Sequence, residues 1–484
     1  MEDNVAGDIA SALAPQLGGE VEVSDLRPLT SGASRQSWRF EAASCAGPPR
    51  PYVLQREMVP ASARPAGDPA PLGMGVQGML LERAAAQGVP VPPFVATGET
   101  GGLEYLITEW LEGEALPPRM LRDPALASGR ARLTEDCAAA LAGIHRIDPR
   151  GLDLHHDDRL AIYRHRLDQI GEPRPVLELA YQWLVANRPQ PGRTVVLHGD
   201  FRLGNLLVGP RGLQAVLDWE IAHLGDRHED VAWATLRPWR FDRHRQPGMF
   251  PEPAAWVEAY NAAAGPGDAV DASKLVWWQV AGTWTWAVMS AMQARRHLDG
   301  WVDSLEHATI GRRVCESEWD LLELLPATRA APAARAAPAA RAAPGGRVRV
   351  ATPVTPVTPG ALVPPAACSD LHGRPTAGEL LDAVRGSLSG RIAEGVDPSL
   401  RHQVRIAVHA LEVVGRELEL GPAQVSAHRA RLAALGVADS AGLARAIREG
   451  RFDPGDPALR AALVADTRAR LEVANPRWLP SASG

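Results

Sequence analysis

Lysine is almost absent from this chain: Lys274 is the single lysine among 484 residues that include 51 lysines and arginines. Cationic sites must therefore be built almost entirely from arginine. Cysteine is also scarce, and the four cysteines, Cys45, Cys137, Cys315 and Cys368, lie far apart and form no CxxC pair. Such spacing indicates neither a zinc site nor a disulfide framework.

Long apolar runs are missing as well. The N-terminus, Met1–Asp3, is acidic and lacks the apolar core of a signal peptide. The most apolar long segment, Leu275–Met292, is interrupted by Gln279, Gly282, Thr283 and Thr285, which favours a buried helix over a membrane span. The net charge of −6 gives no overall basic field. We therefore expect a cytoplasmic protein that binds neither nucleic acid nor membranes.

Two short stretches carry the residues with the clearest chemistry. His198–Asn205 reads HGDFRLGN, and Leu217–Glu220 reads LDWE. Asp200 can accept a proton from a substrate hydroxyl, while Asn205 and Asp218 can hold the magnesium ions that bridge ATP phosphates. These residue types and their order are typical of phosphoryl transfer.

The residues between the two stretches predict a β-hairpin. Residues 206–208 form an apolar strand-like run, 209–212 read Gly-Pro-Arg-Gly, and 213–217 form a second run. Such a hairpin returns Asp218 to the side of Asn205, where both side chains can serve one site.

This pattern resembles the catalytic segment of the aminoglycoside phosphotransferase family, which has a protein-kinase-like fold. The resemblance implies that Asp200 is the catalytic base, that His198 orients the loop by hydrogen bonding, and that Asp218 bridges metal and phosphate. Glu220 becomes a candidate neighbour of the metal or substrate. Asp230 would anchor the backbone of the catalytic loop from the start of a helix.

The distribution of strand and helix patterns fits that fold. Strand-like runs occupy 37–40, 52–54 and 104–107, and the chain is mostly helical after about residue 120. We expect an α+β fold with a bilobal kinase-like domain over residues 1–326. Its N-lobe would cover about 1–111 and its C-lobe about 112–326.

A composition change marks the end of this domain. Residues 327–372 are rich in Pro and Ala, which predicts a disordered linker, and residues 373–484 predict a separate small all-α domain of unknown role. Thr376 and Glu379 form a capping box, Gly421-Pro422 would end one helix, and Asp456-Pro457 would start another. The surface of such a domain is a candidate binding site for a partner protein.

The nucleotide side contains a short loop and a hinge. Backbone N–H groups of a loop at Ser31, Gly32, Ala33 and Ser34 can approach phosphates. The backbones of Glu109 and Leu111 could pair with adenine at the turn between the lobes. The expected nucleotide is ATP with Mg²⁺, although GTP remains an alternative.

Two positions depart from the family pattern. In the family, the strand residue that contacts ATP is commonly Lys, and in one branch it is Arg. The position aligns with Gln55 of this chain, with Arg56 beside it. A strand alternates faces, so both cannot point into the cleft. The helix position usually held by Glu appears as Gln77. Either Gln55 and Gln77 form a neutral pair, or Arg56 takes the position of the base.

The acceptor side is marked by arginine. Arg237 and Arg240 belong to the run RPWRFDRHR, which suits a carboxylate, a phosphate or a coenzyme A ester better than a polycationic aminoglycoside. The helices after residue 284 resemble the acyl-CoA-dehydrogenase-associated branch of the family, whose members are linked to hydroxyacyl-CoA compounds. The sequence thus predicts an ATP-dependent O-phosphotransferase acting on a small-molecule hydroxyl. A pseudokinase scaffold and an antibiotic phosphotransferase are the alternatives.

Overall fold

A computed structural model of the protein describes residues 2–29, 35–44, 47–58, 71–240, 252–326, 371–387 and 400–480. The chain forms two compact units. The first contains residues 1–162 and 187–285, and the second contains 163–186 and 286–484. Each unit is considered by itself below.

The first unit begins with an antiparallel sheet. Its spatial order is β1-β2-β3-β5-β4, and its strands are β1 (Val21–Pro28), β2 (Arg35–Ser44), β3 (Arg50–Glu57), β4 (Phe94–Thr100) and β5 (Leu103–Glu109). The predicted runs at 37–40, 52–54 and 104–107 are therefore confirmed as strands.

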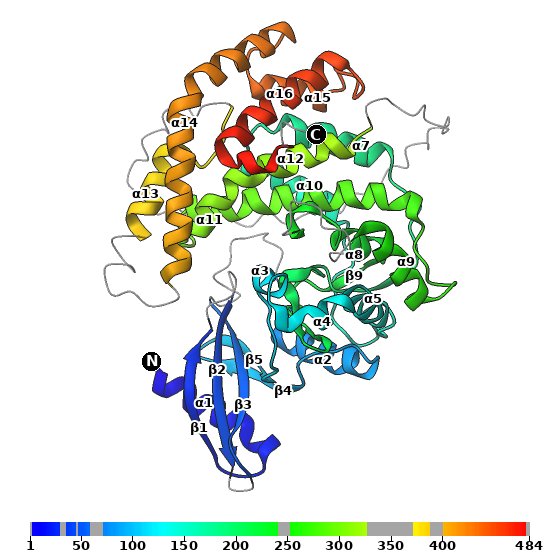
Figure 1. The fold of residues 1–484 in the computed structure, drawn as a ribbon, viewed down its shortest axis with the longest axis vertical. Helices are drawn as coiled ribbons and strands as arrows, with labels where there is room; N and C mark the ends of the chain where they lie inside the picture. Colours follow the sequence, from blue (N-terminus) through cyan, green and yellow to red (C-terminus); the bar gives the residue numbers. More distant parts are fainter. Residues whose placement is uncertain are drawn as a thin grey trace, which may run out of the picture. The chain divides into compact units, whose positions relative to one another are not determined.

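The two faces of this sheet pack against different helices. Helix α1 (Glu2–Leu17) lies against one face (Figure 1), where its residues Ile9 and Leu13 join Tyr52 and Leu54 in one apolar cluster. Helix α2 (Met74–Ala86) contacts β4 and β5, and Leu106 packs into its cluster. Because strand residues alternate sides, position 106 faces away from α1.

The rest of the first unit is mainly helical and carries two short two-stranded ladders. Strand β6 (Thr194–Leu197) pairs with β9 (His223–Asp226), and β7 (Leu206–Gly209) pairs with β8 (Gly212–Val216). The predicted hairpin at 206–217 is confirmed. The helices are α3 (Pro117–Met120), α4 (Ala127–Ala131), α5 (Leu133–Ile144), α8 (His228–Trp233) and α9 (Pro253–Ala264), with single 3₁₀ turns at Pro124–Leu126, Leu203–Asn205 and Arg237–Trp239. The predicted α+β kinase-like fold, with a sheet lobe and a helical lobe, is confirmed.

Two helices continue from one unit into the other: α6 (Arg159–Ile170) and α10 (Ala272–Leu298). The further helices of the second unit are α7 (Pro175–Ala186), α11 (Leu305–Ile310), α12 (Val314–Leu324), α13 (Ala377–Ser387), α14 (Leu400–Ala434), α15 (Ser440–Arg448) and α16 (Pro457–Ala474), with 3₁₀ turns at Gly311–Arg313 and Pro476–Trp478. Within this unit α15 packs on α7, and α16 packs on both α12 and α14.

The predicted division at the linker does not coincide with these units, because the C-terminal helices share one compact unit with 163–186 and 286–326. Residues 327–370 of the predicted linker lie outside the described residues. Its last two residues do not behave as linker: Leu371 and His372 are both buried. The folded segment therefore starts before residue 373.

Helix starts in the C-terminal segment follow the predicted capping. Thr376 and Glu379 exchange the two hydrogen bonds of a capping box, and Asp456 caps α16 with Pro457 at its first position. The predicted helix end at Gly421-Pro422 is wrong, since α14 continues through Pro422 to Ala434. Proline removes one helical hydrogen bond, but α14 packs on α13 through residues before Pro422, and His428 after it bonds to Asp466 of α16.

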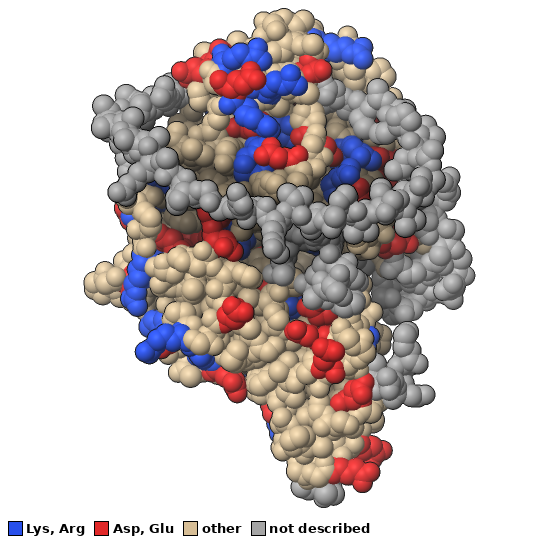
Figure 2. Space-filling model, turned by 180° about the vertical axis from the view of Figure 1, so that it is seen from behind, with Lys and Arg blue, Asp and Glu red and all other residues tan. Residues whose placement is uncertain are grey.

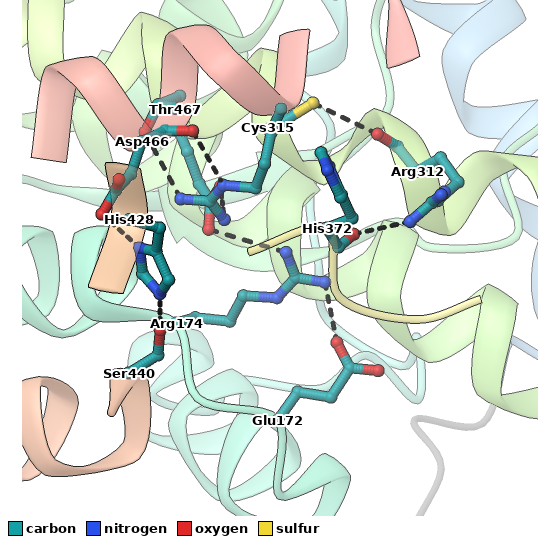
Figure 3. A network of polar contacts seen from close by, with 11 residues as sticks. Glu172, Arg174, Arg312, Cys315, His372, His428, Ser440, Asp466 and Thr467 are labelled. Atoms are coloured by element: carbon teal, nitrogen blue, oxygen red, sulfur yellow. Dashed lines mark hydrogen bonds and ion pairs between the residues drawn. The ribbon is translucent and has the colours of Figure 1, made fainter. Parts of the chain in front are cut away.

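Buried charged residues connect the elements of the second unit (Figure 3). Arg312 donates from Nη1 to the carbonyl oxygen of His372 over 2.8 Å, and Arg174 donates to Glu172 over 2.7 Å. His428 bridges Asp466 and Ser440 through its two ring nitrogens at 2.9 and 3.1 Å. The contacts of Arg312 with His372 and of His428 with Asp466 join segments that lie far apart in the sequence.

Cys137 and Cys315 are buried free thiols, while Cys45 and Cys368 lie outside the described residues. Within the described ranges no helix combines the length and apolar character needed to cross a membrane. The face shown in Figure 2 carries arginine and acidic side chains side by side over the C-terminal helices. That part of the surface has mixed charge.

Candidate active site

Asp200 lies in the loop that connects β6 to β7, and three donors hold its carboxylate. Arg202 Nε reaches Oδ1 and Oδ2 at 2.9 and 3.0 Å, Asn205 Nδ2 reaches Oδ2 at 2.7 Å, and Trp233 Nε1 reaches Oδ1 at 2.8 Å. An ionised carboxylate accepts hydrogen bonds but donates none. The arrangement therefore holds the Asp200 carboxylate in one orientation.

The loop backbone is anchored by Asp230, which is fully buried near the start of α8. Its carboxylate accepts hydrogen bonds from the backbone N–H groups of His198 and Gly199 at 2.8 and 2.9 Å, and it contacts His145 Nε2 at 3.2 Å. Burial acts to raise the pKa of Asp230, but hydrogen bonding and charge from His145 outweigh it and lower that pKa. Asp230 thus stays ionised beneath the loop, the position that the resemblance implies for it.

His198 supports the loop from inside. It is fully buried, and burial lowers its pKa, so the ring is neutral. The ring accepts the Asp200 N–H at Nδ1 over 3.2 Å, and its Nε2 lies 3.0 Å from the carbonyl oxygen of Leu217. With Nε2 protonated, both contacts are satisfied. His198 thus links the Asp200 loop to the residue before Asp218.

The hairpin brings Asp218 to the same place. The N–H of Leu217 donates to the carbonyl oxygen of Asn205 over 2.8 Å, which fixes the ends of β7 and β8 together. Asp218 has φ 63°, a left-handed conformation that non-glycine residues seldom adopt. Aspartate tolerates this region better than most residues, and the turn directs the chain from β8 towards Glu220.

The buried carboxylate of Asp218 lies within electrostatic reach of two other acids, Glu220 and Asp200. Burial first, then the charges of Glu220 and Asp200, raise the pKa of Asp218 to about 7, while Arg35 and Arg202 act in the opposite direction. Carboxylates that repel one another in a buried site can be stabilised by a cation. The pair of Asp218 and the amide oxygen of Asn205 fits a magnesium ion.

The described residues contain no group of three or more His, Cys, Asp and Glu side chains placed to hold a metal ion. Magnesium in phosphoryl-transfer sites is commonly held by one or two carboxylates together with substrate phosphates. Asn205 and Asp218 match that partial protein ligand set.

On the sheet side, Arg56 points away from the site. Arg56 and Gln36 are directly paired across β3 and β2 and are joined by a 2.9 Å hydrogen bond. The guanidinium also lies over the Trp38 ring at 5.1 Å. Arg56 shares its face with Leu54, which packs against α1, and Gln55 occupies the opposite face. The structure therefore contradicts the alternative that Arg56 takes the position of the ATP-contacting base.

One residue that sequence reasoning missed is Arg35, the first residue of β2. Its guanidinium is buried, and Nη1 donates to Gln77 Oε1 over 2.9 Å. Its Nε lies 3.3 Å from Glu220 Oε2. Arg35 follows directly after the Ser31–Ser34 stretch, but only the register of β2 against β3 shows that it shares a face with Gln55.

The other predicted nucleotide contacts are placed only in part. Ser31, Gly32, Ala33 and Ser34 lie outside the described residues. Glu109 ends β5, and its N–H donates to Pro93 O over 2.9 Å, so an adenine contact from this residue would use its carbonyl oxygen. Leu111 follows the strand and makes no backbone hydrogen bond through its N–H to any described residue.

The predicted acceptor residues divide into two groups. Glu220 belongs to the acidic site described above. Arg240 instead donates from Nε to the carbonyl oxygen of Thr235 over 2.8 Å, and Arg237 begins the short 3₁₀ helix that ends just before Arg240. The remaining basic residues of this run, from 241 to 245, lie outside the described residues. The cation beside Asp200 is Arg202, whose guanidinium lies over Trp239 at 4.7 Å.

A cavity of about 330 Å³ shares Trp233 with the Asp200 site. Trp277, Trp278 and Leu160 contribute to its walls. Its size and largely apolar lining are typical of small-molecule sites. Two acidic residues of the lining pair with arginine: Asp158 with Arg188, and Glu229 with Arg159.

The sheet lobe, the anchored catalytic loop and the acidic hairpin end define a kinase-like phosphotransferase. Comparison with known families agrees: the chain belongs to the phosphotransferase enzyme family, which matches residues 25–275, more than half of its length. Residues 394–478 match a domain of unknown function, DUF6285.

Curated relatives share parts of this chain. Acyl-CoA dehydrogenase family member 10 of Mus musculus is 31% identical over 172 residues, which cover 32% of this chain and 16% of that protein. Family member 11 of Homo sapiens is 28% identical over 201 residues, which cover 38% and 25%. The chain thus spans a quarter or less of the length of these two relatives.

Two further similarities concern phosphotransferases. An aminoglycoside 3'-phosphotransferase of Niallia circulans is 26% identical over 164 residues, which cover 32% of this chain and 60% of that protein. A solved structure from Ralstonia eutropha JMP134, described as a candidate aminoglycoside phosphotransferase, has a TM-score of 0.52 at 18% identity and covers 66% of this chain and 98% of that one. The latter similarity supports the fold.

Proposed function

We propose that this enzyme transfers the γ-phosphoryl group of ATP to the hydroxyl of a small molecule, with Asp200 as the catalytic base. The observation that carries the proposal is the carboxylate of Asp200, held in one orientation by hydrogen bonds from Arg202, Asn205 and Trp233. A fixed carboxylate can accept the hydroxyl proton as the oxygen attacks phosphorus.

Asn205 and Asp218 would hold Mg²⁺, which neutralises charge on the phosphates when it is bound. Because little covalent chemistry falls to the protein in phosphoryl transfer, catalysis rests on positioning and on electrostatic stabilisation. His198 and Asp230 act as positioning residues, since both contact the loop that carries Asp200.

For the acceptor we propose a molecule with an apolar part and an anionic group, such as a hydroxy acid or a hydroxyacyl coenzyme A ester. The tryptophan-lined cavity suits the apolar part. Arg202, next to the base, offers Nη groups that make no hydrogen bond to any described residue and can pair with an anion.

An antibiotic phosphotransferase is a weaker candidate, because a polycationic acceptor needs free carboxylates. The acids that line the cavity are largely paired with arginine or histidine. The scaffold alternative rests on Gln55 and Gln77, which leave the usual lysine–glutamate pair without either charge.

The test is ATP turnover with Mg²⁺ against hydroxy acids, hydroxyacyl coenzyme A esters and aminoglycosides. We expect turnover with an anionic acceptor and its loss in Asp200→Ala. Turnover with aminoglycosides alone would contradict the acceptor class. Binding of magnesium–ATP without transfer to any acceptor would favour the scaffold.

For the C-terminal helices we propose an accessory role with a partner protein. Capture experiments with the intact chain and with exposed α14 residues replaced, Val408→Ser and Leu411→Ser, test this without removing helices that pack on α7 and α12. Equal capture by both forms would contradict a partner surface on α14.

A further inference from the structure

The sheet lobe of this enzyme contains no lysine, and the strand position that usually supplies one is Gln55. Phosphoryl-transfer enzymes of this fold place a cation on the ATP phosphates. A cation must therefore come from another place in the lobe if the proposed function is correct.

Arg35 shares a sheet face with Gln55. In the antiparallel register of β2 and β3, Arg35 lies opposite Glu57, and Ser37 lies opposite Gln55. Directly paired residues share a face, and so do residues two positions apart. Arg35 therefore lies on the neighbouring strand, diagonal to the usual lysine position and on the same face.

Its surroundings match those of a phosphate-contacting cation. The side chain of Arg35 is 5% exposed, and Gln77 on α2 holds its Nη1. Gln77 is itself fixed, because its Nε2 donates to the carbonyl oxygen of Leu72 over 2.5 Å. Besides Glu57, which is paired with it across the strands, Arg35 has a second acidic neighbour in Glu220, two residues after Asp218. Gln77 on α2 and Glu220, in the segment that carries Asp218, thus position the guanidinium together.

Two donor groups of Arg35 are left over. Nε and Nη2 are buried and make no aligned hydrogen bond to any described residue, although Nε is within ion-pair distance of Glu220. A buried guanidinium with unused donors is costly unless an acceptor completes it. Phosphate oxygens are suitable acceptors, since guanidinium pairs with phosphate through two parallel hydrogen bonds.

We infer that Arg35 replaces the missing lysine and contacts the ATP phosphates, with Gln77 and Glu220 as its positioning residues. This inference rests on the proposed function, because it assumes that ATP binds between the sheet lobe and Asp218. It explains how a kinase site operates without lysine: the cation comes from β2, its amide partner from α2, and its acidic partner from the segment after β8.

The experiment compares the affinities of magnesium–ATP and adenosine for the unmodified full chain and four variants of it. Arg35→Gln should weaken ATP binding about 10–100-fold, the effect of losing one or two charged hydrogen bonds, and leave adenosine binding unchanged. Arg56→Gln is the matched control on the opposite face and should alter neither affinity. Arg35→Gln combined with Gln55→Lys should recover part of the ATP affinity, since it returns a cation to that face.

Arg35→Lys guards against a folding defect, because it keeps the charge and should bind ATP more tightly than Arg35→Gln. Unchanged ATP affinity in Arg35→Gln, or equal losses for ATP and adenosine, would overturn the inference in favour of a purely structural Arg35. Absence of ATP binding by the unmodified protein would instead contradict the proposed function itself.

Discussion

Asp218→Asn is expected to remove magnesium-dependent ATP binding and, at the same time, to stabilise the protein in the absence of metal. Asparagine keeps the shape of the side chain and tolerates the left-handed backbone at φ 63°. It removes the charge that burial, Glu220 and Asp200 disfavour. Turnover should fall by at least 10²-fold, an effect of the order expected for a lost electrostatic contribution.

The stabilisation depends on pH with a defined sign. The pKa of Asp218 is raised from 3.8 to about 7 in the folded protein. Unfolding therefore releases a proton at pH values between these two pKa values. The free energy of unfolding of the unmodified protein should therefore decrease as pH rises from 4 to 7. At about 1.4 kcal/mol per pKa unit, the cost reaches about 4 kcal/mol at most above pH 7.

Denaturant unfolding of both forms at pH 4.5 and 8, without metal, measures this effect. The variant should gain stability over the unmodified protein at pH 8 and little at pH 4.5. Asp25→Asn is a matched control, because Asp25 also has a positive φ, 54°, but pairs with Arg27 and Arg39. Equal stability of Asp218→Asn and the unmodified protein at both pH values would contradict the claim that burial and neighbouring acids destabilise the ionised form of Asp218.

The second large effect is expected from Glu318 in the second unit. Its carboxylate is fully buried and lies 2.6 Å from Arg470 Nη1 and 3.7 Å from Arg174 Nη1. Removing one member of a buried charge network leaves the other charges without compensation, at a cost of about 3–5 kcal/mol. Glu318→Ala should lower the free energy of unfolding by that amount.

Thermal or urea unfolding followed by circular dichroism is the measurement. Glu449→Ala provides a control, because Glu449 pairs with Arg451 on the surface, where such pairs contribute about 0–1 kcal/mol. Replacing Glu318 with Leu and Arg470 with Met together should recover part of the loss, since both charges then leave the interior. A loss of less than 1 kcal/mol in Glu318→Ala would contradict the role assigned to this network.

The catalytic segment could be predicted from sequence because its residues are local. The loop at 198–205 and the hairpin that follows span about twenty residues, and turn residues separate the two apolar runs. The predicted hairpin alone brings Asp218 to the side of Asp200 and Asn205, and the structure has the same hairpin.

The residues that escaped prediction depend on long-range pairing. The role of Arg35 requires the register between β2 and β3 and the approach of α2, neither of which local sequence specifies. The same is true of Trp233, whose indole reaches Asp200 from another element. In the second unit, the sequence alone does not distinguish buried arginines and acids from surface residues. Helix α14 continues through Pro422 because it packs against neighbouring helices, which the local sequence does not show.

The most direct test of the central claim is transfer of labelled γ-phosphate from ATP to an acceptor in a single turnover, compared between the unmodified enzyme and Asp200→Asn. Asparagine retains an oxygen for the Trp233 hydrogen bond but cannot accept a proton. We predict a phosphoester product from the unmodified enzyme and a rate lowered about 10²–10⁴-fold in the variant, with ATP affinity retained. Equal rates in both forms would show that Asp200 is not the base and would contradict the account.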